Sequence, residues 1–132
     1  MIKGIGHLGI VVKDVENSLK ALSQVIELKS PAIKDFPEKK MRCAVVETEG
    51  VALEFLQDDS DSGFLGRFRR EKGDAIHHFC LLSDNIEKDV EALKKRGVEM
   101  MDQKPRIGLR GKKVAMTMPG ALNGITIELS EP

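Results

Sequence analysis

Two histidines and two glutamates occupy matching places in a pattern that this chain contains twice. His7 opens the first copy, GHLGIVVKDVENSLKAL, and Glu54 closes it in VALEFLQ. His78 opens the second copy in HHFCLLSDNIEKDVEAL, and Glu128 closes it in ITIELSE. Two imidazole nitrogens and two carboxylate oxygens suit a divalent transition metal. The duplication therefore predicts one metal site on a pseudo-twofold axis, with His7, Glu54, His78 and Glu128 as its ligands.

Strands must hold these four side chains. Alternation in GHLGIVVK puts Leu8 and Ile10 on one strand face and His7 on the other. Glu54 and Glu128 alternate in the same way with apolar neighbours. We expect all four to point to the helix-free face of a sheet, where strands keep a ligand set rigid. Four protein ligands in an octahedral sphere leave two positions for water or a bidentate substrate.

A helix is expected to follow the first strand of each copy. Asp14 is a suitable N-cap of the first helix, and Asp84 with Glu87 forms a capping-box signal for the second. Gly97 is a suitable stop for the second helix. The apolar helix faces have helical spacing: Val15, Leu19, Leu22 and Ile26 in the first copy, and Ile86, Val90 and Leu93 in the second.

The remaining segments predict further strands and one short helix. MRCAVVE and VALEFLQ indicate a hairpin, and KKVAMTM and ITIELSE indicate strands joined by a loop rich in proline, glycine and asparagine. Between the copies, SDSGFLGRFRREKGD predicts a short helix with Phe64, Leu65 and Phe68 on its buried side. The basic residues of this segment are interpreted as a solvated helix face: Arg67, Arg69, Arg70 and Lys72.

Length and composition favour one compact domain without a strongly charged partner. The 132 residues include 21 basic and 21 acidic side chains, so no net charge attracts nucleic acid or a membrane surface. No segment reaches the ~20 apolar residues of a membrane span, and the start MIKGIGHLGIVV lacks the features of a secretory signal. Cys43 and Cys80 lie in apolar runs and are expected to be buried thiols of a reducing cytoplasm. His77 lies on the strand face opposite His78 and is assigned to structure.

Nearly the whole chain resembles the vicinal oxygen chelate superfamily, and within it the methylmalonyl-CoA epimerases. GHLGIVVKDVENSL, LEFLQDDSDSGFLGRFRREKGDAIHHF and the closing GITIEL carry the resemblance. It implies an α+β fold in which paired βαβββ modules form an open, curved, eight-stranded mixed sheet around a central metal site. The single domain, residues 1–132, would consist of modules at about 4–57 and 75–131, joined by a short helical segment.

The resemblance also implies an activity. It is that of a metal-dependent epimerase acting at the alpha carbon of an acyl-CoA thioester such as methylmalonyl-CoA. A divalent cation (cobalt, manganese, nickel or zinc) would stabilise the enolate left after proton abstraction. Reprotonation from the other side inverts the carbon, so each side requires an acid-base group, and Glu128 is the candidate for one of them. We further expect a cytoplasmic homodimer without a nucleic-acid or membrane partner.

The chain departs from the epimerase pattern near the expected substrate position. Some family members carry a second glutamate where this chain has Cys43. Family epimerases commonly carry histidines where this chain has Arg110 and Met118, and a polar pair where it has Gly120 and Ala121. The chain also contains no Tyr and no Trp. These departures bear on the identity of the substrate more than on the metal.

Other functions in the same superfamily stay open. Glyoxalase I, a lactoylglutathione lyase, uses the same ligand order, and Glu54 is the residue type that it prefers where some epimerases carry glutamine. A metal-free module that binds antibiotics would hold its ligand by stacking, for which 5 Phe without Tyr or Trp offer little. A ring-opening dioxygenase would need only two histidines and one carboxylate.

Overall fold

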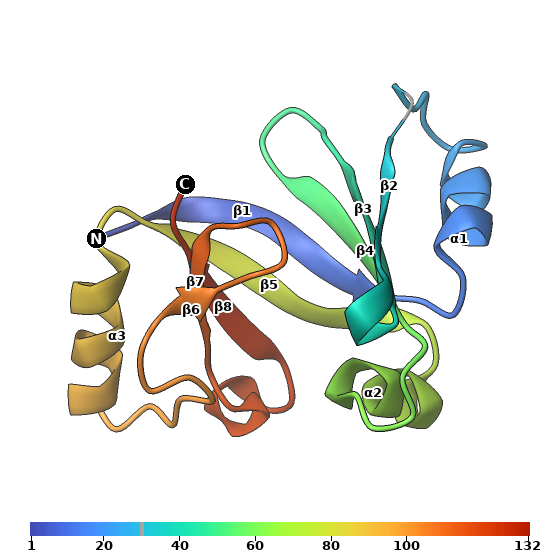
Figure 1. Ribbon diagram of the computed structural model, residues 1–132. Coiled ribbons are helices and arrows are strands. Elements are labelled where there is room, and N and C mark those ends of the chain that lie inside the picture. Colours follow the sequence, from blue (N-terminus) through green and yellow to red (C-terminus); the bar gives the residue numbers. More distant parts are fainter. Residues whose placement is uncertain (30) are drawn as a thin grey trace. The chain divides into compact units, whose positions relative to one another are not determined.

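The computed structural model describes residues 1–29 and 31–132, and its fold is α+β (Figure 1). Eight strands form one mixed sheet with the order β2-β3-β4-β1-β5-β8-β7-β6. The strands are β1 (Ile2–Val11), β2 (Ile33–Phe36), β3 (Met41–Val46), β4 (Ala52–Asp58), β5 (Ala75–Ser83), β6 (Arg106–Ile107), β7 (Lys113–Met116) and β8 (Thr126–Ser130). The α-helices in the described ranges are α1 (Val15–Leu22), α2 (Phe64–Lys72) and α3 (Ile86–Lys95). The expected fold class and the eight-stranded mixed sheet are confirmed.

The chain divides into two compact units. The split unit comprises Met1–His7 and His78–Pro132, and the continuous unit comprises Leu8–His77. Both divisions fall inside a strand, β1 after His7 and β5 after His77. The α-helices α1 and α2 belong to the continuous unit, and α3 belongs to the split unit.

In the continuous unit, α1 packs against β3 and β4, which pair antiparallel as the expected hairpin. Asp14 caps α1 as predicted, since its Oδ1 accepts a hydrogen bond of 3.1 Å from the backbone N–H of Asn17. The core beneath α1 consists of buried apolar side chains: Val12, Val15, Leu19, Ala44, Val46 and Phe55. The prediction that Ile26 continues the helical face was wrong, because α1 ends at Leu22 and Ile26 is 38% exposed.

The predicted buried side of α2 was partly wrong. Leu65 and Gly66 are its buried residues, whereas Phe64 is 47% exposed. The backbone N–H of Gly66 donates to Asp58 Oδ2 at 3.1 Å, which turns the Leu65–Gly66 side toward the end of β4. Phe68 is half-buried and packs edge-on against His77, with ring centroids 4.9 Å apart. His77 is thus a packed structural residue, as expected.

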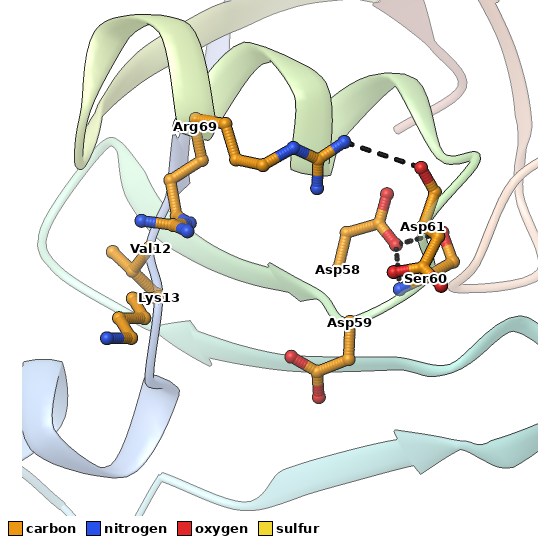
Figure 2. A pocket seen from close by; sticks show the side chains of 8 residues that line it. Val12, Lys13, Asp58, Asp59, Ser60, Asp61 and Arg69 are labelled. Atoms are coloured by element: carbon orange, nitrogen blue, oxygen red, sulfur yellow. Dashed lines mark hydrogen bonds between the residues drawn. The ribbon is translucent and has the colours of Figure 1, made fainter.

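Some basic residues of α2 line a cavity in addition to contacting solvent. Arg67, Arg70 and Lys72 are exposed, in agreement with the interpretation as a solvated face, and Arg69 is half-buried. Arg69 and Arg70 line a cavity of about 240 Å³ (Figure 2). The other lining residues come from the segment just after β1 and from the end of β4 with the loop that follows it: Val12, Lys13, Asp58, Asp59, Ser60 and Asp61.

In the split unit, α3 packs against β7 and β8. Its core consists of Ile86, Val90, Met100, Ala115 and Leu129, all buried. Local hydrogen bonds define both ends of α3. The predicted stop of α3 at Gly97 is confirmed, because this residue has a φ of 85° and donates its backbone N–H to Lys94 O.

The predicted capping box of α3 was wrong. Asn85 is the N-cap, and its side chain accepts a hydrogen bond of 3.2 Å from the backbone N–H of Lys88. Asp84 instead forms an ion pair with Lys3 on β1 at 3.7 Å. β5 extends to Ser83, so the chain enters the helix one residue later than the capping-box pattern indicates. Asn85 is the residue that aligns with Asp14 in the duplication.

Both cysteines are buried thiols, as expected for Cys43 and Cys80. Within the described ranges, no helix combines the length and the apolar character needed to cross a membrane.

Candidate metal centre

One face of the split unit carries the residues that could hold a metal. Leu129 of β8 and Leu81 of β5 pack toward α3. His78 and Glu128 alternate with these residues and therefore lie on the opposite face of their strands. β5 and β8 are parallel and adjacent, with His78 opposite Thr126 and Cys80 opposite Glu128.

β1 brings His7 to the same place. The backbone O of Met1 accepts a hydrogen bond from Asp84 N, and His7 Nε2 lies 3.3 Å from His78 Nε2. Residues 1–7 therefore run antiparallel along 78–84, and this places the two imidazoles together. Their rings meet edge to face, with centroids 5.4 Å apart.

Glu128 completes a compact group with the two histidines. Its Oε1 lies 3.4 Å from His7 Nε2, and its Oε2 lies 3.9 Å from His78 Nε2. His7 and His78 are 3% and 2% exposed, so the two imidazoles are shielded from solvent. Two nitrogens and a carboxylate that converge on one point, from three strands of one sheet, fit a divalent transition metal.

The electrostatics of His7 favour its neutral form. Burial, and then the positive charge of Arg110, lower the pKa of His7 to about 4. A histidine must be neutral to coordinate a metal, so this shift favours the charge state that a metal ligand needs at neutral pH.

Arg110 is a member of the site that sequence reasoning did not find. Its Nη2 lies 2.9 Å from Nδ1 of His7. Arg110 lies in the turn between β6 and β7, more than a hundred residues from His7, and no local pattern in the sequence links the two positions. Only its place in a glycine-containing loop singled it out, as a departure from the epimerase pattern.

Cys80 is the second residue that sequence reasoning missed. The ligand atoms of His7, Cys80 and Glu128 all lie within 4.8 Å of one another, and Cys80 is fully buried. The signal was present in the sequence, because Cys80 follows His78 by two residues and a strand alternates with period two. Cys80 is thus a buried thiol as expected, but one beside the candidate ligands.

Glu54 lies on β4 of the continuous unit and is 7% exposed. Phe55 and Leu53 of the same strand pack with the α1 core, so Glu54 faces away from that helix, as predicted. In the β3–β4 register, Glu54 pairs with Val45 and the next same-face pair is Leu56 with Cys43. Cys43 therefore shares the face of Glu54 and is 1% exposed.

Comparisons with known proteins agree with this fold. The chain is 28% identical to an uncharacterized protein of Bacillus subtilis (strain 168), over 97% of this chain and 91% of that protein. It is 27% identical to the mitochondrial methylmalonyl-CoA epimerase of Mus musculus, over 96% of this chain and 72% of that protein. A solved structure of methylmalonyl-CoA epimerase in complex with methylmalonyl-CoA and NH4+ has a TM-score of 0.88 at 19% identity, over 99% of this chain and 95% of that one.

The family model gives the broader assignment. The description of this model is the glyoxalase/bleomycin resistance protein/dioxygenase superfamily, and it matches residues 6–116. The match includes His7, Glu54 and His78, and it ends before Glu128 on β8. Because it spans most of the 132 residues, the chain belongs to the glyoxalase/bleomycin resistance protein/dioxygenase superfamily.

Proposed function

We propose that this protein is a metal-dependent epimerase that inverts the alpha carbon of an acyl-CoA thioester such as methylmalonyl-CoA. The observation that carries the proposal is the convergence of His7 Nε2, His78 Nε2 and the Glu128 carboxylate within 3.3–3.9 Å in a chain whose relatives include methylmalonyl-CoA epimerases. We further propose that the protein is a cytoplasmic homodimer.

Glu54 is proposed as the fourth ligand. It occupies the position in the first copy that Glu128 occupies in the second, on a strand face turned away from the helix of its unit. Its carboxylate is buried, and buried carboxylates in proteins are paired, hydrogen-bonded or bound to metal. Cobalt, manganese, nickel and zinc all accept two nitrogens and two carboxylate oxygens, so the ligand types leave the metal open.

The chain's own residues would perform three tasks. A divalent cation at this site would supply positive charge beside the thioester oxygen while the alpha proton leaves. The imidazoles of His7 and His78, held by β1 and β5, keep the cation in place and keep its charge close to substrate. The Glu128 carboxylate is the candidate that takes up or returns the proton on one side of the alpha carbon. A partner on the other side is still needed, and Cys43 stands where some relatives carry a glutamate.

The test is exchange of the alpha proton of methylmalonyl-CoA in heavy water. The protein is stripped of metal, reloaded with cobalt, manganese, nickel or zinc, and the exchange is followed by NMR. We expect exchange only with metal, and its loss in Glu128→Gln and in His78→Gln. His77→Gln is the matched control, because His77 is the neighbouring histidine on the other strand face. Circular dichroism verifies that each variant is folded.

The outcome separates the substrate from the scaffold. Exchange that is equally fast without metal, or unchanged in Glu128→Gln, would contradict the proposed mechanism. Tight metal binding without exchange would rule out an acyl-CoA substrate, and the proposal of a metal site would remain valid. The glutathione hemithioacetal used by glyoxalase I is then the next substrate to test, because Glu54 is the residue type found at that ligand position in glyoxalase.

A further inference from the structure

The contact between Arg110 and His7 constrains where the proton of His7 lies. Nη2 of Arg110 is 2.9 Å from Nδ1 of His7. A guanidinium group carries only donors and stays protonated in proteins, so Nδ1 must accept this hydrogen bond. An imidazole that accepts at Nδ1 is neutral and carries its single proton on Nε2.

Nε2 is the nitrogen that faces the candidate metal position. It lies 3.3 Å from His78 Nε2 and 3.4 Å from Glu128 Oε1, and either atom can accept its proton. A metal requires the lone pair of this same nitrogen. Binding therefore requires Nε2 to lose its proton and Nδ1 to gain one, so that His7 remains neutral.

A proton on Nδ1 is incompatible with the present position of Arg110. Two donors would then face each other across 2.9 Å. Metal-bound histidines normally donate the outer N–H to a carboxylate, a carbonyl or water, and an arginine offers no such acceptor. We propose that Arg110 holds His7 only in the metal-free protein and that metal binding requires its guanidinium to leave Nδ1. The inference rests on the proposed metal site.

The turn that carries Arg110 allows this release by rotation of the side chain. Gly108 N donates to Lys112 O at 2.8 Å, and Gly111 N donates to Gly108 O at 3.0 Å, so the backbone of the turn is held on both sides of Arg110. Arg110 is nevertheless an exposed residue, with solvent available to its side chain. A rotamer change of an exposed arginine is fast and needs no rearrangement of β6 or β7. Arg110 thereby sets the affinity of the site without being a ligand.

The tautomer of His7 is measured first, in metal-free protein labelled with ¹⁵N at its 3 histidines. Nitrogen–proton correlation spectra distinguish a protonated from an unprotonated ring nitrogen. We expect protonated Nε2 and unprotonated Nδ1 for His7. Addition of Zn²⁺ should reverse this pattern, with Nε2 bound to metal and Nδ1 protonated. Metal-free His7 with a protonated Nδ1, or zinc binding that leaves Nδ1 unprotonated, would overturn the proposal.

Zn²⁺ affinity is the second measurement, by competition with a chelating dye. Arg110→Met removes the donors and the charge, and we expect it to bind zinc about tenfold more tightly, since no charge-assisted hydrogen bond must be broken. Lys112→Met is the matched control, because Lys112 lies exposed on the same turn and its loss removes the same charge. We expect the control to change the affinity by less than about twofold, because exposed charges are screened.

The two measurements separate this inference from the proposed function. If Arg110→Met and Lys112→Met bind zinc equally well, Arg110 does not compete with the metal, although the metal site stands. If neither the wild type nor Arg110→Met binds zinc, cobalt, manganese or nickel, the metal site and the competition both fall.

Discussion

The split unit and the continuous unit bury their helices in the same way. In each, a polar side chain at the aligned position caps the helix, Asp14 in one and Asn85 in the other. The first residue of each helix, Val15 and Ile86, is buried in the core of its unit. The helix side of the duplicated unit has therefore kept both its caps and its packing, as the need to bury one apolar helix face requires.

The opposite faces of the two units differ. In the split unit, His7, His78 and Glu128 meet there, with Arg110 against His7. In the continuous unit, the face of Glu54 also carries Lys34, Cys43 and Leu56. His7 opens the first copy of the pattern yet belongs to the split unit, so three of the four matching side chains lie in that unit and Glu54 lies in the continuous unit. The difference teaches that the compact units do not coincide with the two copies of the pattern.

The largest expected effect concerns the two aligned glutamates. Glu128→Ala and Glu54→Ala should each weaken zinc binding by at least about 1,000-fold, more than the 10–100-fold that loss of an outer partner of a metal ligand costs. Competition titration measures both affinities. Strong weakening by Glu128→Ala alone would show that the continuous unit supplies no ligand, and the comparison would become one of a binding unit and a purely structural one.

Core truncation compares the helix layers. Ile86→Ala should lower the free energy of unfolding by about 3 kcal/mol, and Val15→Ala by about 2 kcal/mol, because each leaves a cavity under its helix. Urea denaturation monitored by circular dichroism measures both. A single transition for each variant would mean that the two units unfold together. A variant that loses less than about 0.5 kcal/mol would mean that its helix layer is loosely packed.

Acid should destabilise the metal-free protein through its buried histidines. Burial lowers the pKa of His7 to about 4 and also lowers the pKa of His77 below its ordinary value. The unfolded chain then binds more protons than the folded one between pH 6.5 and 4, so stability falls as the pH drops through that range. We expect a loss of about 1–3 kcal/mol, measured by urea denaturation at pH 7, 6 and 5.

Single histidine substitutions show how much of this acid-induced loss of stability comes from each unit. His7→Gln should remove a larger part of the pH dependence than His77→Gln, because only His7 also faces the charge of Arg110. Equal slopes in the wild type and in His7→Gln would show that His7 does not remain neutral upon folding. Carboxylates paired with a cation, such as Glu87, whose pKa Lys113 lowers, change charge at lower pH than the histidines. They therefore do not obscure the comparison of the two histidine variants.

The smallest expected effects concern the helix caps. Asp14→Ala and Asn85→Ala should each lower the free energy of unfolding by about 1 kcal/mol, since each removes the acceptor of a helical N–H. Asp84→Ala is the control and should cost less than about 0.5 kcal/mol, because Asp84 makes only exposed ion pairs. Thermal denaturation resolves the difference. A larger effect at Asp84 than at Asn85 would restore the capping-box prediction.

The sequence by itself determined the repeated features of this protein. Strand alternation assigned His7, His78, Glu54 and Glu128 to the face away from the helices, and helical spacing identified most of the two helix cores. These patterns are readable because they depend on residues two to four positions apart. Asn85 aligns with Asp14 in the duplicated pattern, but the local capping-box signal predicted Asp84 as the N-cap.

Only the tertiary structure decided what depends on distant or competing contacts. The hydrogen bond between Arg110 and His7 joins parts of the chain that no periodicity relates. Phe64 is exposed because Gly66 bonds to Asp58, and this contact rotates the buried side of α2. The short strands β2 and β6 carry too few residues for an alternation pattern and exist through their pairing with β3 and β7. Local sequence specifies which face a side chain takes, whereas packing of the whole chain specifies which side chain it meets there.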